Sequence, residues 1–219
     1  MIELINVSKR YHGNDVLTGL NLTINEGDFI SIRGKSGVGK TTLLKIMGLL
    51  DQSDEGEVSI LGKNIKNLRD EEASNLRLKN IGFVFQFFGL IPSLMVQENI
   101  ELPLALARVN KNERKNRVLS LLTYFNLTSL AERYPNSLSG GERQRIAVIR
   151  ALANKPKIIL ADEPTSSLDN ENSNLLMKLI YNINRERKVT IVITTTDLYA
   201  KLPTNKNYML KDGQLHEIT

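Results

Sequence analysis

A glycine-rich segment in this sequence has the residue types that bind phosphate groups. The segment is GKSGVGKT, Gly34 to Thr41, and it matches the pattern G-x-x-x-x-G-K-[ST]. Its glycines let the backbone curl so that several N–H groups converge on phosphate oxygens, and a helix that follows adds its positive end. We expect Lys40 to reach the β- and γ-phosphates of a nucleotide and the Thr41 hydroxyl to bind Mg²⁺. The expected nucleotide-binding residues of this segment are Gly34, Lys35, Ser36, Gly37, Val38, Gly39, Lys40, Thr41 and Thr42.

An acidic pair at the end of an apolar run could supply the catalytic carboxylates. The run KIILADEP reads as a buried strand that ends in Asp162-Glu163. Asp162 is placed to hold Mg²⁺ through water, and Glu163 could orient and deprotonate an attacking water. A lone acidic pair at a strand end is often only solvated, but beside a phosphate loop we interpret it as catalytic.

Three consecutive threonines follow a second apolar run, in IVITTTD, Ile191 to Asp197. Ligands of open parallel sheets bind beyond the carboxyl ends of the strands, so residues 194–197 would face such a site. The alternative is that threonine is simply a good strand former.

The elements that must position these groups are apolar strands that alternate with helices. Strands are expected at residues 2–7, on both sides of a Glu26-Gly27 turn within 16–34, and at 56–62, 81–86, 157–164, 189–197 and 207–213. Helices are expected at 40–50, 97–109, 113–125, 141–153 and 170–187. This alternation predicts a parallel α/β sheet with a mostly helical lobe inserted at about residues 93–153.

Composition narrows the class of protein. The chain has 219 residues, a net charge of +5 and no cysteine, which excludes a disulfide framework and a thiolate metal site. No uncharged apolar run approaches the ~20 residues that a membrane helix needs, and the first residues lack an apolar signal-peptide core. We therefore expect neither a membrane-spanning segment nor export by that route. The basic run from Arg108 to Arg117 contains Glu113 and no stacking aromatics, so a solvated helix face is expected and no nucleic-acid partner.

A third motif carries a family resemblance. The segment LSGGERQRIAVIRAL, Leu138 to Leu152, lies between the phosphate loop and the acidic pair. With them it resembles the nucleotide-binding subunit of ATP-binding-cassette (ABC) transporters. In that family a signature motif begins a helix that caps the γ-phosphate of ATP held by the opposite subunit. The matching residues here are Ser139, Gly140, Gly141 and Glu142. Two glycines and a serine at a helix N-terminus suit an anion.

The resemblance covers nearly the whole chain and implies a fold, cofactors and partners. It implies a P-loop NTPase core of the RecA type with an N-terminal antiparallel β subdomain. The core would comprise residues 1–92 and 154–219, and the inserted helical subdomain residues 93–153. ATP and Mg²⁺ would be the cofactors. A membrane permease and a second nucleotide-binding subunit would be the partners, with the chain held peripherally on the cytoplasmic face of the cell membrane.

The resemblance also assigns roles to isolated residues. Tyr11 resembles the aromatic that stacks on adenine, although an ordinary edge-strand tyrosine is the alternative. Gln86 resembles the glutamine that binds Mg²⁺ and senses the nucleotide, where the alternative is a polar loop residue. Asp169, in SSLD, resembles a residue of the loop that crosses the dimer interface; alone it would be only a helix cap.

One position departs from the family. In family members, the strand after the catalytic glutamate ends in Thr-His-Asp. That histidine contacts the γ-phosphate and helps to hold the attacking water. Here the residues are Thr195-Thr196-Asp197, and the chain's two histidines are His12 and His216. Thr196 therefore stands at the histidine's place, so the threonine run is expected to face the site.

Two functions of different classes remain. The leading hypothesis is an ATPase subunit that drives a permease, in the branch that includes lipoprotein-releasing, macrolide- or peptide-exporting and cell-division ATPases. Its cargo would be a peptide, lipid-linked or drug-like substrate, and Thr196 could make turnover slow. The rival is a nucleotide-dependent clamp that barely hydrolyses ATP, which Thr196 favours and Glu163 opposes. A third function, a DNA-repair or chromosome-organising ATPase, would need a long coiled coil between the phosphate loop and the signature. The sequence has only the helical lobe there, which disfavours this function.

Overall fold

A computed structural model describes residues 1–218 of the protein. The strands are β1 (Ile2–Tyr11), β2 (Asn14–Ile24), β3 (Phe29–Arg33), β4 (Glu55–Ile60), β5 (Lys63–Asn64), β6 (Ile81–Val84), β7 (Ile158–Asp162), β8 (Thr190–Thr195), β9 (Lys206–Lys211) and β10 (Gln214–Ile218). The helices are α1 (Lys40–Met47), α2 (Asp70–Asn80), α3 (Val96–Leu106), α4 (Lys111–Tyr124), α5 (Gly140–Ala151) and α6 (Asn170–Arg187).

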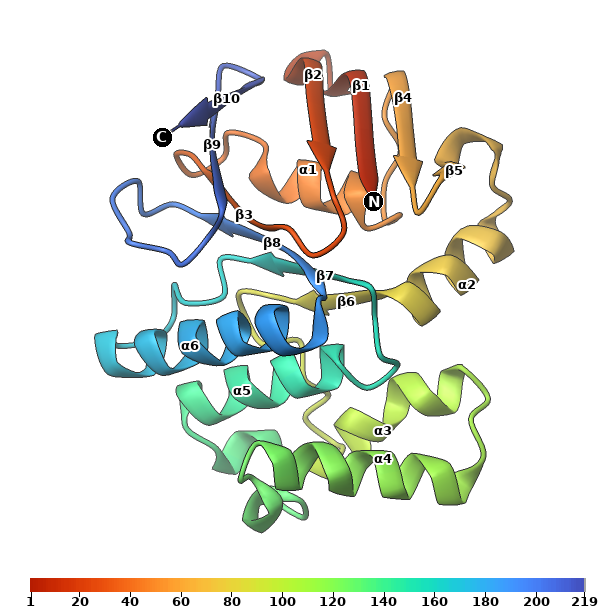
Figure 1. Ribbon diagram of the computed structural model, residues 1–219, viewed down its shortest axis with the longest axis vertical. Coiled ribbons are helices and arrows are strands. Elements are labelled where there is room, and N and C mark those ends of the chain that lie inside the picture. The colour runs from red at the N-terminus through yellow and green to blue at the C-terminus, as the bar shows by residue number, and fades with distance from the viewer. Residues whose placement is uncertain (219) are drawn as a thin grey trace.

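These strands form two sheets (Figure 1). The first is antiparallel, in the order β2-β1-β4-β5. The second has the order β10-β9-β3-β8-β7-β6, and its strands are parallel except for the terminal β9–β10 hairpin. Strands β3, β8 and β7 are parallel neighbours, so the loops that follow them all lie at the carboxyl ends of the strands, on the same side of the sheet.

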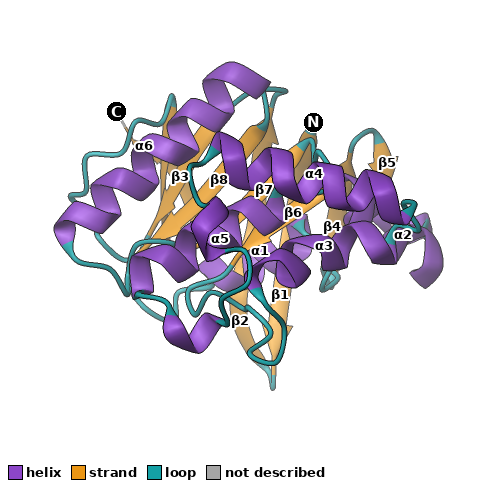
Figure 2. Ribbon diagram, turned by 90° about the horizontal axis from the view of Figure 1, so that it is seen from below, coloured by secondary structure: helices purple, strands orange, loops and turns teal. Residues whose placement is uncertain are grey.

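Both faces of the parallel sheet are covered, which explains its continuous apolar strands. In β7, Ile158 and Leu160 join a core with α1 and the antiparallel sheet, whereas Ile159 and Ala161 join a core with α3 to α6. Helix α1 thus lies between the two sheets (Figure 1), and α5 and α6 cover the opposite face (Figure 2). Helix α4 packs against α3 and lies farther from the sheet (Figure 1).

Helix α5 contacts both the sheet and the inserted helices. It packs against β6 and α6 on one side and against α3 on the other. The apolar core is therefore continuous from the parallel sheet into the inserted helices. The division of the chain at residues 92/93 and 153/154 stays a prediction. Within residues 1–218, no helix is both long and apolar enough to cross a lipid bilayer.

Three features differ from the sequence expectations. Strand β1 continues to Tyr11 instead of ending at Val7, because bulges in its pairing with β2 break the alternation of apolar residues. Helix α2 was not expected, since it buries no residue and therefore has no apolar stripe. Strand β10 follows β9 through Asp212-Gly213, whose positive φ angles of 50° and 75° suit a tight hairpin; this Asp-Gly pair was the available signal.

Candidate active site

The loop between β3 and α1 has a backbone path that only glycine allows at some positions. Gly37 and Gly39 have φ angles of 77° and 108°, in the left-handed region. A Cβ at Gly34 would lie 2.7 Å from the carbonyl oxygen of Leu210. Helix α1 then begins at Lys40, so the loop leads directly into a helix N-terminus, as an anion site requires.

Lys40 is buried at the base of this loop. Its side chain is 4% exposed, and its Nζ donates to the carbonyl oxygens of Gly34 and Lys35 at 3.0 Å each. The same ammonium lies 3.2 Å from Glu163 Oε1. The Lys35 and Ser36 side chains are exposed, Val38 and Thr42 are half-buried, and Thr41 is exposed in the first turn of α1.

Asp162 is the last residue of β7, and its carboxylate accepts hydrogen bonds from two hydroxyl groups. Thr41 Oγ1 donates to Asp162 Oδ2 at 2.7 Å, and Thr194 Oγ1 donates to Asp162 Oδ1 at 2.6 Å. Thr194 is completely buried in β8 and pairs with Asp162 in the sheet register. The threonine run that begins at Thr194 was expected to face the site, but Thr194 itself was given no role there; its place at the carboxyl end of β8 was the signal.

Glu163 lies between Lys40 and Thr196. Its φ angle of 44° is left-handed, which is unusual for a residue with a side chain and turns the chain away from β7. The backbone N–H of Glu163 donates to the Thr194 carbonyl oxygen, and its Oε2 accepts from Thr196 Oγ1 at 3.4 Å. Glu163, expected to be the catalytic glutamate, and Thr196, expected to stand at the family histidine's position, are therefore neighbours.

These groups fit a nucleotide with its magnesium. The loop offers backbone N–H groups and a buried ammonium to phosphates, and the joined Thr41 hydroxyl and Asp162 carboxylate offer the oxygen donors that Mg²⁺ prefers. No cluster of three His, Cys, Asp or Glu residues suited to a metal occurs in residues 1–218. Gln86 lies two residues beyond β6 at the same edge, and its side chain has no hydrogen bond in the described part of the chain.

Tyr11, at the end of β1, is held by two neighbours. Its hydroxyl donates to Asp51, and the Lys9 ammonium lies 5.2 Å from the ring centroid while it also pairs with Asp51 at 3.0 Å. The hydrogen bond to the Asp51 carboxylate raises the pKa of Tyr11 above its usual value. Tyr11 is 37% exposed, so part of its surface is accessible to a ligand. Sequence reasoning missed Asp51, which no motif marks.

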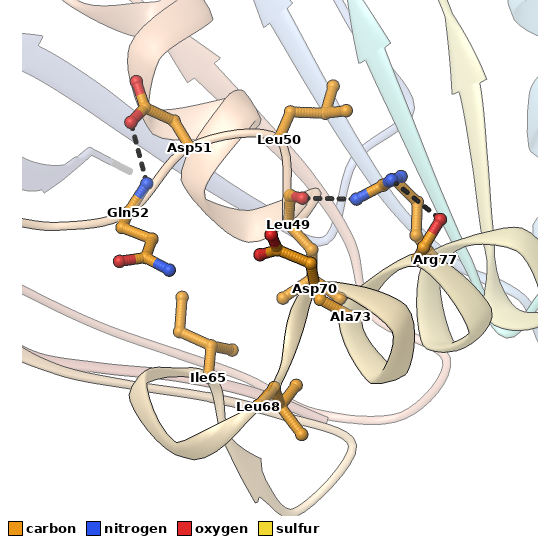
Figure 3. Close-up of a pocket in the computed structure, with 10 residues that line it drawn as sticks. Leu49, Leu50, Asp51, Gln52, Ile65, Leu68, Asp70, Ala73 and Arg77 are labelled. Carbon is orange, nitrogen blue, oxygen red and sulfur yellow. Dashed lines mark hydrogen bonds between the residues drawn. The ribbon is translucent and has the colours of Figure 1, made fainter.

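A separate hollow lies beside Asp51. Figure 3 shows this pocket of ≈ 340 Å³ between the loop after α1 and helix α2, where Arg77 donates to the Leu49 carbonyl oxygen. Its other lining residues include Leu68 and Ala73, and no phosphate-loop residue is among them. Asp51 lines this pocket and the phosphate-loop residues do not, so the pocket is distinct from the phosphate-binding groups.

The signature segment begins α5. Ser139 is the N-cap: its Oγ accepts from the Glu142 N–H, and Glu142 Oε2 accepts from the Ser139 N–H at 2.8 Å. This capping box lowers the pKa of Glu142, chiefly through the hydrogen bond from the Ser139 backbone. Gly140 and Gly141 lie against the segment before and at the start of α6, where a Cβ on Gly141 would lie 2.3 Å from Asn172 Oδ1.

Asp169 caps α6 and is tied to the signature through Asn172. Its Oδ1 accepts from the Asn172 N–H and its Oδ2 from the Asn172 side-chain amide, both at 2.8 Å. Within residues 1–218, no hydrogen bond or ion pair joins the signature residues to the phosphate loop. The expected site residues thus form two groups: one around Lys40, Asp162, Glu163 and Thr196, and one around Ser139 and Asp169.

Comparisons with known proteins give a consistent result. The family model described as ABC transporter matches residues 17–166. The chain is 43% identical over 98% of its length to the lipoprotein-releasing system ATP-binding protein LolD of Bacteroides thetaiotaomicron, covering 99% of that protein. It is 44% identical over 98% of its length to the ABC transporter ATP-binding protein MJ0796 of Methanocaldococcus jannaschii, covering 95% of that protein.

Solved structures agree with the sequence comparisons. A dimeric post-hydrolysis structure of the ATP-binding cassette MJ0796 with ADP and phosphate has a TM-score of 0.91 at 42% identity, covering 100% of this chain and 98% of that one. A cbiO1 structure from Clostridium perfringens, part of an ABC transporter complex, has a TM-score of 0.87 at 27% identity, covering 98% and 86%. These matches confirm the fold class expected from the sequence.

Proposed function

The chain belongs to the ABC transporter family, and from that premise we propose that it is the ATP-hydrolysing subunit that powers a separate membrane permease. The observation that carries the proposal is the set of contacts around Asp162 and Glu163. A phosphate loop, a magnesium-binding oxygen pair and a carboxylate paired with the loop lysine lie within hydrogen-bond reach of one another. Phosphoryl transfer to water needs mainly positioning and charge stabilisation, and these groups supply both.

We assign each group a role in hydrolysis. The loop N–H groups and Lys40 bind the β- and γ-phosphates, while Tyr11 stacks on the adenine. Thr41, Asp162 and Gln86 hold Mg²⁺, which when bound neutralises charge on the phosphate oxygens. Glu163 orients the attacking water and takes its proton. Because Lys40 is paired with Glu163, phosphate binding must draw the ammonium away and leave Glu163 free for water.

The second group of residues completes a site on another subunit. Ser139, Gly140 and Gly141 form a helix start that no hydrogen bond or ion pair joins to the phosphate loop within residues 1–218. The relative MJ0796 crystallised as a dimer, which supports a sandwich in which this helix start meets the γ-phosphate of the partner. Asp169, beside the signature, would lie at the same interface.

A groove near the Gln86 loop is the proposed contact for the permease. It has a volume of ≈ 610 Å³ and an apolar lining that includes Leu50, Phe85, Leu102 and Leu106. Arg150 of α5 reaches the floor of this groove and donates to the carbonyl oxygens of Phe88 and Gly89. A permease element in the groove would therefore touch both the Gln86 loop and the helix that carries the signature. Docking there would hold the chain peripherally on the inner face of the membrane.

The names of the relatives support a proposal for the cargo class. Three LolD proteins, each named for lipoprotein release, are 40–43% identical to this chain. We propose export or extraction of a peptide, lipid-linked or drug-like substrate by the permease.

Phosphate release from ATP tests the proposed activity. The purified chain should release phosphate in Mg²⁺, and EDTA should stop the release. Glu163→Gln should slow it roughly 10²- to 10⁴-fold, because a general base is lost. The rival function, an ATP-dependent clamp, is favoured by Thr196. It would appear as ATP-dependent dimers of the wild type whose phosphate release is no faster than that of Glu163→Gln.

A further inference from the structure

A buried arginine lies next to the phosphate loop and has no acidic partner. Arg33 is the last residue of β3 and only 7% exposed. Its Nη1 lies 3.4 Å from the Asp197 carbonyl oxygen and 3.2 Å from that of Leu198, and its Nη2 lies 3.4 Å from Asn207 Oδ1. Its Nε has no hydrogen-bond partner, and within residues 1–218 no carboxylate lies within ion-pair distance.

Burying Arg33 in this way is energetically unfavourable for the fold alone. Burying a charge is unfavourable unless it is hydrogen-bonded, and an apolar side chain would satisfy β3 equally well. All the partners that Arg33 does have lie on the two strands beside β3 or directly after them. Two of the three are carbonyl groups of the loop that follows β8, so the arginine's main effect is to fix that loop.

The loop carries Thr196. Arg33 pairs with Thr195 in the sheet register, and the next N–H, that of Gly34, donates to the Thr195 carbonyl oxygen at 3.2 Å. Beyond Thr195 the loop turns outward, and Tyr199 is 91% exposed. Within the described residues, the hydrogen bonds that the Asp197 and Leu198 carbonyl groups accept come from Arg33.

Thr196 depends on this placement more than a longer side chain would. A threonine hydroxyl lies close to its own backbone, so a small shift of the loop would carry Thr196 Oγ1 out of reach of Glu163 Oε2, now 3.4 Å away. We propose that Arg33 is a positioning residue for hydrolysis: it holds the loop after β8 so that the Thr196 hydroxyl stays against Glu163. The inference rests on the proposed function of Glu163 and Thr196.

Single-turnover hydrolysis at saturating Mg-ATP tests the inference with Arg33→Met, Thr196→Ala and the double variant. Arg33→Met should slow hydrolysis roughly 3- to 10-fold, the effect of one lost positioning hydrogen bond, with ATP affinity within about twofold of wild type. The double variant should be no slower than the slower single variant, because both changes break one arrangement. Arg33→Lys should recover part of the rate, since a lysine can still donate to a loop carbonyl group.

Ser31→Ala is the matched control. Ser31 lies on the same face of β3, is buried, and donates to Asn207 Oδ1 at 2.7 Å, but it does not touch the loop after β8. Its hydrolysis rate should equal that of wild type. Amide hydrogen exchange without nucleotide gives a second measurement. Arg33→Met should speed exchange at residues 196–201 and leave the phosphate loop unchanged, whereas Ser31→Ala should do neither.

Some outcomes would overturn the inference. Wild-type hydrolysis and exchange in Arg33→Met would do so, as would rate losses that multiply in the double variant. If Thr196→Ala is slow but Arg33→Met is not, only the inference about Arg33 is wrong. If Thr196→Ala itself hydrolyses ATP at the wild-type rate, the proposed role of Thr196 is wrong as well. Should Arg33→Met not fold, Arg33→Lys takes its place: a rate between those of wild type and Thr196→Ala, with faster exchange at residues 196–201, supports the inference, and the wild-type rate with wild-type exchange contradicts it.

Discussion

The Lys40 ammonium lies 3.2 Å from Glu163 Oε1, so the cation expected at the γ-phosphate is paired with the carboxylate expected to activate water. Lys40 also donates to two carbonyl groups of the loop, and it is almost fully buried. We propose that a phosphate group in the loop would offer the ammonium a second anionic partner and free Glu163. Nucleotide binding and activation of the proposed catalytic carboxylate would then be joined through one side chain.

Lys40→Ala should weaken ATP binding about 10- to 100-fold. The variant leaves the phosphate charge without its fixed cation, and a hydrogen bond to a charged group contributes about 1.5–3 kcal/mol. Calorimetry with Mg-ATP measures the change. Lys45→Ala, at an exposed position of the same helix, is the control and should bind ATP like wild type. Unchanged affinity in Lys40→Ala contradicts the proposed phosphate site.

Glu163→Gln should produce a dimer that persists in ATP. Within residues 1–218 no hydrogen bond or ion pair joins the signature to the phosphate loop, so in the proposed sandwich two chains enclose the nucleotide, and slow hydrolysis should keep them together. The wild type without nucleotide should be mainly monomeric. Size-exclusion chromatography with and without Mg-ATP compares the two proteins. A Glu163→Gln protein that stays monomeric at saturating Mg-ATP argues against the homodimeric sandwich, or for a different obligatory partner.

Tyr11→Ala should lower ATP affinity roughly 5- to 100-fold, the range expected for loss of one base–aromatic stack. Tyr11→Phe keeps the ring and should bind within a few-fold of wild type, although it loses the hydrogen bond to Asp51. Calorimetry with ATP and with inorganic triphosphate separates the contributions, because triphosphate has no base. If Tyr11→Ala weakens triphosphate as much as ATP, the ring does not stack on adenine.

The capping box at the signature should make stability depend on pH. Hydrogen bonds from Ser139 lower the pKa of Glu142 below its ordinary value of 4.5 in the folded protein. The charged carboxylate therefore stabilises the fold above about that pH, and the contribution is lost as the pH falls through the lowered pKa. At pH 6 Glu142→Gln should be less stable than wild type by roughly 0.3–1 kcal/mol, the effect of a charge at a helix N-terminus. Chemical denaturation at pH 6 and pH 3 should show this difference shrinking; a constant difference contradicts the assignment.

Motifs with backbone requirements could be predicted from the sequence. The glycines at 34, 37 and 39 mark a loop whose φ angles and close contacts exclude side chains, and buried strands such as Ile158–Asp162 are apolar on both faces. Helix α2 could not be predicted in this way, because none of its residues is fully buried and its sequence lacks a periodic apolar face.

Residues that act through long-range contacts could not be predicted either. Asp51 reaches Tyr11 from forty residues away, and Arg33 reaches the loop at residues 197–198 only because β3 and β8 are neighbours in the sheet. Nothing in the local sequence of either residue indicates its partner. Thr194 lies between these cases: the end of its strand was expected at the site, but its hydrogen bond to Asp162 depends on the register of β7 and β8.

Thr196→His should speed hydrolysis without changing ATP affinity. The threonine hydroxyl touches Glu163 but lies close to its own backbone, so it reaches a γ-phosphate only through water or a shift of the strand. It also cannot carry the positive charge of an imidazolium. Loss of one preorganised donor at a developing charge lowers a rate by roughly 10²–10³, so the wild type should be slow and the histidine should recover much of that factor.

Single-turnover kinetics on the homodimer of this chain is the suitable measurement, because a partner subunit with its own histidine would keep one of two sites fast. Tyr199→His is the matched control: it adds a histidine to the same loop at a fully exposed position and should leave the rate unchanged. A rise in Thr196→His alone, at similar ATP affinity, supports a site weakened by the threonine. If the wild type is already fast and the histidine changes nothing, the contact between Thr196 and Glu163 holds the water as well as an imidazole does, and the interpretation of Thr196 as a weakened position is wrong.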